Sequence, residues 1–214
     1  MYKKKPFFIV FEGVEGCGKS FQSKKLLNNL KKKRIPVLLT REPGGTKSAE
    51  LIRNLILKDY FNHDSKEKFD KYTDTLLYLA ARNEHIKNKI DPALKKKSVV
   101  ICDRFTDSTL AYQVYGKNVN INFINNIHKF ILGKIKPNLT FVLKVSTETS
   151  KKRLKKRKTK NRYDNFAQNF YSKAQNSFLK IAKNKKNYFV LNSSKNDSNL
   201  EKKIFKIVSA YLKI

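Results

Sequence analysis

Residues 13 to 20 read G-V-E-G-C-G-K-S, a full match to the phosphate-binding pattern G-x-x-x-x-G-K-[ST]. Glycines let backbone N–H groups converge on phosphate oxygens. Lys19 would place a positive charge near the β- and γ-phosphates, and the Ser20 hydroxyl would ligate Mg²⁺. An apolar stretch precedes the motif and a helical pattern follows it, which is the context that the motif requires. The predicted nucleoside triphosphate site consists of Gly13, Val14, Glu15, Gly16, Cys17, Gly18, Lys19 and Ser20.

A carboxylate follows a second apolar stretch, in the sequence VVICDRF at residues 99–105. In an open α/β sheet the carboxyl ends of the strands line the binding crevice, so we expect Asp103 to face the glycine motif. There its carboxylate would hold Mg²⁺ directly or through water, together with Ser20. The alternative role of an isolated Asp after a strand is a helix N-cap. Arg104, the next residue, favours chemistry on an anion.

Short β-branched or aromatic runs alternate with longer helical patterns along the chain. The predicted strands are residues 7–11, 36–40, 98–102, 139–145 and 188–191. Their nearly continuous hydrophobicity is typical of a parallel sheet that is covered on both faces. The predicted helices beyond the glycine motif are residues 47–57, 73–90, 121–132 and 200–214. We therefore predict an α/β fold, a doubly wound five-stranded parallel sheet flanked by helices, as in P-loop NTPases.

The composition bounds the function. A chain of 214 residues fits a single domain over 1–214. Its 48 Lys and Arg against 17 Asp and Glu give a net charge of +31, which suggests a nucleic-acid or anionic membrane partner. The lysines are spread along the whole chain, which fits a biased composition as well as a binding surface. A dedicated nucleic-acid binder more often concentrates its charge on one motif.

The cysteines and the hydropathy indicate the compartment. Cys17 and Cys102 have no metal-ligand spacing, so neither a disulfide framework nor a zinc site is suggested. No stretch approaches the ~20 apolar residues of a membrane span. We therefore expect a cytoplasmic protein without a membrane partner, in which Cys17 fills the glycine loop and is not a nucleophile.

A second nucleotide motif is a coincidence. Residues 88–91 read N-K-I-D, the guanine-reading pattern of GTPases. In a GTPase this tetrapeptide follows an apolar strand, whereas here it ends the helical pattern NEHIKNKID. We therefore reject a GTPase.

The whole chain resembles the bacterial thymidylate kinases, P-loop nucleoside monophosphate kinases that transfer the γ-phosphoryl group of ATP to dTMP. The matching stretches are FEGVEGCGKS at 11–20, TREPGGT at 40–46, LLYLAAR at 76–82, DRFTDSTLAYQ at 103–113 and the basic segment ending in NRYD at 161–164. TREPGG and DR-x-x-x-S-x-x-AYQ are specific to this family, whereas the glycine motif is not. The resemblance implies that Mg-ATP phosphorylates dTMP to dTDP in dTTP synthesis, directly and without a covalent enzyme intermediate.

The dTMP site implied by this resemblance is chemically reasonable. Arg41 directly follows a predicted strand, and the turn after it can hold a guanidinium toward the acceptor. Tyr78 and Arg82 share one helix face, so Tyr78 would stack on a pyrimidine while Arg82 donates to its O4, unless the aromatic belongs to the core. Similarity also puts Tyr112 near the sugar, where it would favour a deoxy substrate. The residues assigned to dTMP are Glu15, Arg41, Arg53, Tyr78, Arg82, Arg104, Thr109, Tyr112 and Gln113.

Glu15 places a carboxylate beside the phosphates, where one branch of the family keeps a basic residue. Such a carboxylate needs a cationic or hydroxyl partner, for which we expect the dTMP sugar or a magnesium-bound water. The missing positive charge must then come from elsewhere. The resemblance implies an arginine in a mobile lid, at about residues 151–165.

The lid prediction rests on residues 151–162, where nine of twelve residues are basic. Aligning the family's lid on NRYD without gaps places Arg157 on the transferring arginine, Arg153 one helical turn earlier and Arg162 in the closed site. The assignment among Arg153, Arg157 and Lys158 stays open. A solvated helix end or loop is the alternative reading of this segment.

The leading hypothesis is an ATP:dTMP phosphotransferase. Catalysis would come mainly from clamping and charge neutralisation, without a general base. The predicted catalytic residues are Lys19, Arg104, Arg153 and Arg157, with Mg²⁺ as cofactor. The family further implies a homodimer packed through helices, with no specific nucleic-acid partner. Another nucleoside monophosphate kinase and a non-catalytic nucleic-acid binder are the rival hypotheses.

Overall fold

The computed structural model describes residues 5–58, 68–156, 168–195 and 197–214. Five strands form one sheet in the order β2-β3-β1-β4-β5, and all neighbouring strands are parallel. The strands are β1 Phe7–Glu12, β2 Val37–Arg41, β3 Val99–Asp103, β4 Leu139–Lys144 and β5 Tyr188–Asn192. Each predicted strand overlaps one of these. The predicted doubly wound parallel sheet is therefore confirmed.

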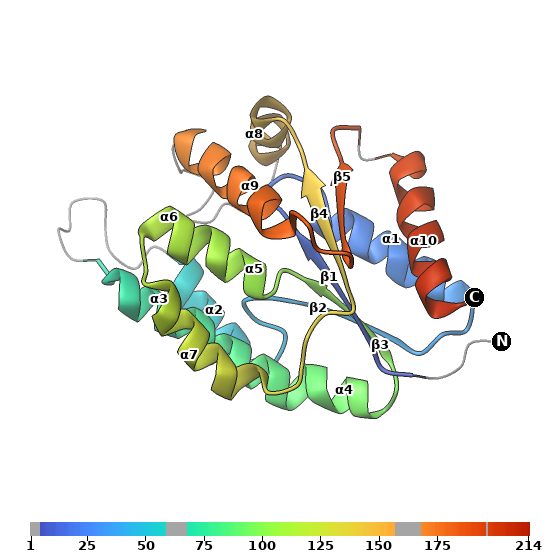
Figure 1. The fold of residues 1–214 in the computed structure, drawn as a ribbon, viewed down its shortest axis with the longest axis horizontal. Helices are drawn as coiled ribbons and strands as arrows, with labels where there is room; N and C mark the ends of the chain where they lie inside the picture. The colour runs from blue at the N-terminus through green and yellow to red at the C-terminus, as the bar shows by residue number, and fades with distance from the viewer. Residues whose placement is uncertain (1–4, 59–67, 157–167, 196) are drawn as a thin grey trace.

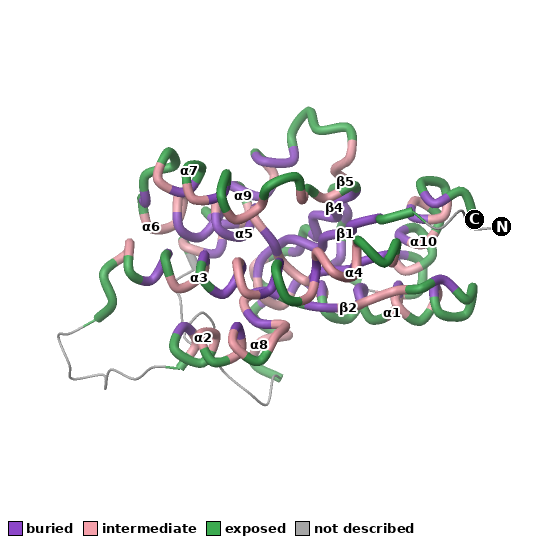
Figure 2. The backbone as a smooth tube through the Cα atoms, turned by 90° about the horizontal axis from the view of Figure 1, so that it is seen from below, coloured by how far each residue is buried: buried purple, intermediate pink, exposed green. Residues whose placement is uncertain are grey.

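The sheet lies between two layers of helices (Figure 1). On one side are α1 (Lys19–Lys32) and α10 (Ser198–Leu212). On the other side are α3 (Lys71–His85), α7 (Ile121–Leu132) and α9 (Gln168–Ala182). All six residues of β1 are buried, and Figure 2 shows this strand as buried in the centre of the molecule. The strongest apolar run of the sequence thus forms the middle of the core.

The helices follow the apolar periodicity of the sequence. In α10 the buried residues Leu200, Ile204, Val208 and Leu212 recur every four residues and pack into the main core cluster. The N-cap of this helix is Asp197, whose side chain accepts the N–H groups of the first turn. The predicted helix over 47–57 is α2 (Lys47–Leu57), and the one over 121–132 is α7.

The long helix predicted over 73–90 is more complex in the structure. After α3 ends at His85, the chain passes through a π-helical turn, η1 (Ile86–Ile90), and continues as α4 (Asp91–Lys95). Pro92 lies at the start of α4, where its missing N–H and its ring are tolerated. The helical path therefore runs past Ile90, the predicted end.

Two helices, α8 and α9, stand before and after the rest of the basic segment in the sequence. Helix α8 (Thr147–Lys155) begins at the N-cap Ser146 and includes the first five residues of the basic run. Helix α9, which the sequence analysis missed, buries Tyr171, Ala174 and Phe178. The spacing of these three residues at intervals of three and four was the available signal.

A third helical segment follows β3 in the chain. It consists of α5 (Thr106–Thr109), the π-helical turn η2 (Leu110–Val114) and α6 (Tyr115–Lys117). This segment carries most of the predicted family motif 103–113 directly after the carboxyl end of β3.

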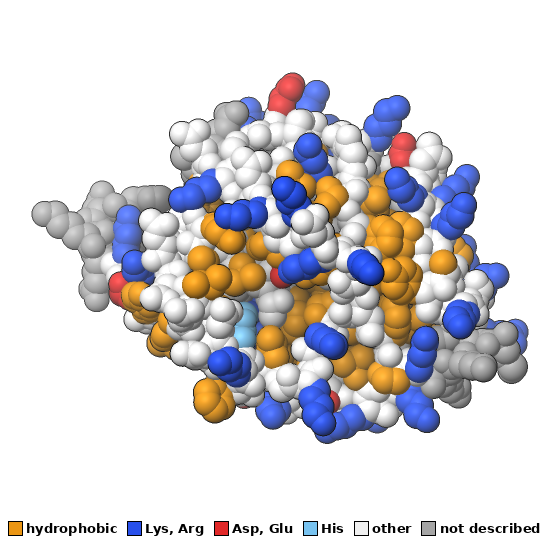
Figure 3. Space-filling model, viewed as in Figure 1, with side chains coloured by type: hydrophobic (Ala, Val, Ile, Leu, Met, Phe, Trp, Pro, Cys, Tyr) orange, Lys and Arg blue, Asp and Glu red, His pale blue; other side chains and the backbone are white. Residues whose placement is uncertain are grey.

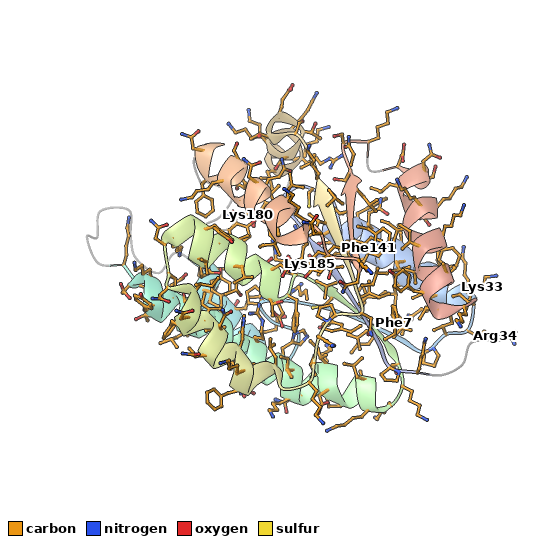
Figure 4. The ribbon with its side chains drawn as sticks, viewed as in Figure 1. Phe7, Lys33, Arg34, Phe141, Lys180 and Lys185 are labelled. Atoms are coloured by element: carbon orange, nitrogen blue, oxygen red, sulfur yellow. The ribbon has the colours of Figure 1, made fainter. Side chains whose placement is uncertain are left out.

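Charged side chains are spread over the surface. On the face drawn in Figure 3, Lys and Arg are scattered among uncharged and apolar side chains. Figure 4 shows Lys33 and Arg34 at the outer end of α1, far from Phe141 in the interior. Within the described residues, no helix is long and apolar enough to cross a membrane.

Candidate active site

One pocket of about 560 Å³ lies at the carboxyl ends of three neighbouring strands. These are the central strand β1, its neighbour β3 and the edge strand β2. The glycine motif follows β1, Arg41 ends β2, and Asp103 ends β3, directly paired with Arg41. This edge is where parallel α/β sheets bind ligands. The predicted site residues that line the pocket are Glu15, Gly16, Gly18, Lys19, Ser20, Arg41, Arg53, Tyr78, Arg82, Asp103, Arg104, Thr109, Tyr112, Gln113 and Arg153.

The glycine motif wraps around the ammonium group of Lys19. The Lys19 Nζ donates to the carbonyl oxygens of Gly13 at 2.9 Å and of Val14 at 2.8 Å. Helix α1 starts at Lys19, and its first turn has no capping side chain among the described residues, which leaves N–H groups for an anion. Gly13 has a φ of +135°, and a Cβ there would lie 2.5 Å from the carbonyl oxygen of Leu143. Cys17 is fully buried in the loop, as a filler residue should be.

Two side-chain groups that could ligate a metal ion through oxygen meet in the pocket, where the Mg²⁺ site was predicted. The Ser20 hydroxyl donates to the carboxylate of Asp103. Asp103 is the last residue of β3, and the N-cap of the following helix is Phe105, so the N-cap alternative for Asp103 is wrong. A hydroxyl and a carboxylate in contact fit Mg²⁺, which takes few protein oxygens and completes its shell with water and substrate phosphates.

Glu15 is neutralised by the chain itself. Its carboxylate accepts from Arg104 at 2.8 Å and from the Tyr112 hydroxyl at 2.7 Å. The Arg104 guanidinium also stacks over the Tyr112 ring at 5.3 Å from the centroid and donates to the carbonyl of Gly13 at 2.9 Å. Burial opposes the charge of Arg104, but Tyr112 and Glu15 hold its pKa well above the usual value. Arg104 and Tyr112 thus supply a cationic and a hydroxyl partner for Glu15, and its contact with the dTMP sugar or a magnesium-bound water stays a prediction.

Glu50, which the sequence analysis missed, brings the two predicted phosphate clamps together. Its carboxylate accepts from Arg41 at 3.1 Å and lies 3.9 Å from the Nε of Arg53. It also accepts the backbone N–H of Gly45 at 2.9 Å. Although burial acts to raise it, these contacts lower the pKa of Glu50. Arg53 in addition donates to the carbonyl of Pro43, which follows a cis peptide bond.

Arg82 is buried inside a polar network beneath the pocket. Its Nε donates to Glu42 at 2.7 Å, one Nη donates to Thr109 at 2.8 Å, and the other to the carbonyl of Phe105 at 2.9 Å. Its side chain is 3% exposed. Tyr78, four residues earlier, is partly buried, packs against the main core cluster and still borders the pocket. Tyr78 therefore packs on the core and lines the pocket, while its stacking on a pyrimidine stays a prediction.

Two histidines complete this network. The Nδ1 of His85 lies 3.1 Å from Glu42, and its Nε2 lies 2.6 Å from the Thr40 hydroxyl. The Nε2 of His128, on α7, lies 2.9 Å from the guanidinium of Arg82. Glu42, His85 and His128 were not identified from the sequence. They come from three separate elements and share no local spacing that could have indicated them.

Gln113 lines the pocket and carries a buried donor without a partner among the described residues. Its side chain is 1% exposed, and its Nε2 finds no hydrogen-bond partner among the described residues. Buried amide groups are normally paired, so an unpaired one at a pocket wall indicates a ligand acceptor.

Glu12, at the end of β1, anchors the segment that carries Arg104. Its carboxylate accepts the backbone N–H groups of Phe105 at 2.8 Å and Ser108 at 3.2 Å, and the Ser108 hydroxyl at 2.6 Å. Burial, and then the nearby Asp107, raise the pKa of Glu12 to about 7. Glu12 carries no motif signal in the sequence, because the glycine motif begins one position later.

The basic segment is described only in part. Arg153 donates to the carbonyl oxygens of Gly16 at 3.1 Å, Ser193 at 2.9 Å and Ser194 at 2.6 Å. It therefore ties α8 to the glycine motif and to the loop after β5. Arg157, Lys158 and Arg162 lie outside the described residues.

The guanine-reading pattern lies inside a helical segment, as expected. Asn88 and Lys89 are in η1, and Asp91 begins α4. Lys89 donates to the carbonyl of Gly45 at 2.6 Å, and Asp91 pairs with Lys95. These side chains serve local structure, so the rejection of a GTPase is confirmed.

A parallel five-stranded sheet with a glycine-lysine-serine loop at its carboxyl edge defines a P-loop NTPase. The family model for thymidylate kinase matches residues 11–204. The chain belongs to the thymidylate kinase family.

Individual relatives agree with the family model. The chain is 42% identical to a thymidylate kinase of Wolbachia pipientis wMel over 177 residues, 82% of this chain and 84% of the relative. It is 37% identical to the thymidylate kinase of Mycoplasma capricolum over 210 residues, 96% of each chain. A crystal structure of thymidylate kinase from Ehrlichia chaffeensis matches with a TM-score of 0.74 at 28% identity, over 95% of this chain and 99% of that one.

Proposed function

We propose that this protein transfers the γ-phosphoryl group of ATP to dTMP, giving ADP and dTDP. The observation that carries the proposal is a single pocket with two chemically distinct halves. One half holds the glycine motif with Ser20 and Asp103. The other holds arginines, Tyr78 and the unpaired amide of Gln113, which suit a nucleoside monophosphate.

The donor half would bind the triphosphate of ATP. Lys19 and the N–H groups at the start of α1 supply positive charge and hydrogen bonds to its phosphates. Ser20 and Asp103 would hold Mg²⁺. When bound, Mg²⁺ neutralises the charge that develops on the phosphate oxygens.

The acceptor half would bind dTMP. Arg41 and Arg53 are held near each other by Glu50 and would bind its phosphate, in place of or beside that carboxylate. Arg82, with the amide of Gln113, would face the carbonyl oxygens of thymine. Tyr112, next to Glu15, would lie beside the sugar.

Catalysis would then be a matter of position and charge. An oxygen of the dTMP phosphate attacks the γ-phosphorus, and the bond from that phosphorus to the β,γ-bridging oxygen breaks, so that ADP leaves. Arg104 lies between the glycine motif and Tyr112, at the junction of the two halves. No side chain has to form a covalent bond or remove a proton.

We propose in addition that 1–214 is one kinase domain with a lid at about 151–165. Arg157 would deliver positive charge to the transferred phosphoryl group, and Arg162 would contribute to the closed site. Arg153 already has three backbone acceptors, which supports an anchoring role for it and leaves the transfer role to Arg157.

The same proposal includes a homodimer. Helices α2 and α3 pack on each other and carry exposed leucines. Leu51 is 69% exposed, Leu55 43% and Leu76 47%. Apolar side chains on two adjacent helices fit an interface between two copies through helices.

A coupled assay for ADP release, with ATP and either dTMP, dUMP, CMP or AMP, tests the function. We expect turnover with dTMP to exceed that with the other acceptors. Equal or greater turnover with CMP or AMP would favour another monophosphate kinase. No turnover with any acceptor, combined with salt-sensitive binding to random DNA, would favour the nucleic-acid binder.

A further inference from the structure

The polar network beneath the pocket contains residues that nothing in the motif analysis assigns. We propose that His128, with Glu42 and His85 opposite it, is a positioning residue that fixes the Arg82 guanidinium for recognition of a 4-oxo pyrimidine. This inference rests on the proposed dTMP site. It adds a specificity determinant on α7, a helix outside the matching family motifs.

One side of Arg82 is fixed by a relay of three residues. Glu42 accepts from the Nε of Arg82 at 2.7 Å and binds His85 at 3.1 Å. Burial opposes the ionised carboxylate, but Arg82 and His85 lower the pKa of Glu42, so it acts as an acceptor. His85 must then donate through Nδ1, and its Nε2 lies 2.6 Å from the Thr40 hydroxyl on the other side of the ring. All of these side chains are buried.

The turn of the TREPGG motif closes over this relay. A Cβ at Gly45 would lie 2.5 Å from the Nε2 of His85 and 2.7 Å from the Oγ1 of Thr40. The backbone at Gly45 has a φ of +95°, which also favours glycine. His85 therefore has little room to turn away from Glu42.

The opposite side of Arg82 is fixed by His128. Its Nε2 lies 2.9 Å from an Nη of Arg82, and since arginine has no acceptor, the histidine nitrogen must accept. Burial, and then the charge of Arg82, lower the pKa of His128 to about 3, so the ring is neutral at physiological pH. With Glu42, Thr109 and the Phe105 carbonyl, His128 engages four of the five N–H groups of Arg82.

A guanidinium held at four N–H groups presents a donor in one fixed direction. A donor there complements the O4 carbonyl of thymine and opposes the 4-amino group of cytosine. Selectivity that depends on a buried polar group is large only if that group cannot rotate to accept the wrong partner. Loss of the His128 acceptor should therefore weaken dTMP binding and reduce discrimination, while the ATP half is unaffected.

The test compares His128→Asn with His128→Gln in the full-length enzyme. The glutamine oxygen can reach the position of the histidine Nε2, whereas the asparagine oxygen is one carbon too short. We expect His128→Asn to raise the KM for dTMP about 10-fold and to lower the dTMP-to-dCMP ratio of kcat/KM. The KM for ATP should stay within about 2-fold, and His128→Gln should recover most of the loss.

Controls separate this role from general stability. Lys129→Ala changes an exposed neighbour on the same helix and should leave both KM values unchanged. Equal effects on the two KM values, or an unchanged KM for dTMP in His128→Asn, would overturn the inference. If His128→Asn does not fold, His128→Phe keeps an aromatic ring without the acceptor and should show the same selective effect. Absence of dTMP turnover in the wild type would overturn the proposed function as well, whereas an active wild type with indistinguishable variants overturns the inference alone.

Discussion

Lys19 holds its ammonium group against two carbonyl oxygens of its own loop. Only 6% of the residue is exposed, so it is not the freely solvated lysine that a loop motif suggests. The phosphates of ATP must therefore approach a charge that is already partly satisfied. The loop pre-positions the cation, which lowers the cost of ordering it in the transition state.

Replacing Lys19 by alanine should abolish turnover and leave the fold intact. The variant loses a charge aimed at the transferred phosphoryl group, and such losses amount to ~10²-fold or more in kcat. Steady-state kinetics, with circular dichroism as the control for folding, provide the measurement. More than about a third of the wild-type rate would contradict the assignment, since so small an effect is near RT.

Glu12 should make the stability of the protein depend on pH. Folding raises its pKa from 4.5 to about 7, so the folded state holds this proton more tightly than the unfolded state. The resulting stabilisation is complete below pH 4.5 and is lost as the pH rises toward 7. Between about pH 5 and about pH 8, the wild type should lose about 2 kcal/mol more of its free energy of unfolding than Glu12→Gln does. Urea titrations across this range measure the difference, and parallel curves for the two proteins would refute it.

At the scale of single residues, the sequence predicts those site residues that lie in one short stretch of the chain. The glycine motif and the carboxylate after a strand were recognisable because the chemistry lies in one short stretch. Glu42 belonged to a recognised motif, but its partner His85 is 43 residues away, and Arg82 and His128 are 46 residues apart. Such pairs form only through tertiary packing, so no local sequence pattern predicts them.

Helix α8 is the element that connects the nucleotide loop to the far edge of the sheet. Arg153 near its end binds the backbone of Gly16 and of the loop after β5. The Ser150 hydroxyl of the same helix donates to the carbonyl of Glu15 at 2.6 Å. Helix α8 therefore supports the glycine motif from one side, and the basic run continues from this fixed point.

Arginines 153 and 157 should give different kinetic signatures. Arg153→Ala removes three hydrogen bonds to backbone carbonyls, so we expect a lower melting temperature and a higher KM for ATP. Arg157→Ala should leave the melting temperature unchanged and lower kcat at least ~10²-fold, because its contact would form mainly in the transition state. Kinetics and thermal unfolding of both variants, with Lys158→Ala beside them, decide between these roles. If Arg157→Ala and Lys158→Ala both keep a near-normal kcat, the lid hypothesis is wrong and the segment is a solvated charged face.

The strands were easier to predict than the helices that cover them. Buried parallel strands are short, uniformly apolar and bounded by polar residues, so their limits are visible in the sequence. The π-helical turns at Ile86–Ile90 and Leu110–Val114 depend on hydrogen-bond patterns that apolar periodicity does not specify. Helix α9 was missed because many polar residues of similar type surround its buried positions.

For the molecule as a whole, the exposed leucines of α2 predict the assembly state. Leu51 and Leu55 lie four residues apart and so share one face of that helix. The double variant Leu51→Glu and Leu55→Glu should convert a dimer into a monomer, since charge in an apolar interface is unfavourable. Sedimentation velocity measures the change, and Lys58→Glu, on the same helix end, is the charge control. A wild type that sediments as a monomer would contradict the proposed dimer.

The surplus positive charge is distributed over the surface. On the face drawn in Figure 3, lysines and arginines are scattered and do not gather into one stripe. Several of the buried or pocket arginines are instead individually matched, Arg82 by Glu42 and Arg104 by Glu15. At the pocket, acidic side chains thus stand where a guanidinium must be held in place.

The contact between Gly45 and His85 restricts how this protein can evolve. A methyl group at position 45 would collide with the ring of His85 and with Thr40, so these three positions cannot change independently. Exchanging the histidine for a smaller residue would remove one of these collisions, but the φ of +95° and the contact with Thr40 would still disfavour an alanine at position 45, and the exchange by itself frees Glu42. Each single step is harmful, whichever comes first. Position 45 is therefore closed to any side chain, whatever residue stands at position 85, and a change at His85 cannot be compensated there.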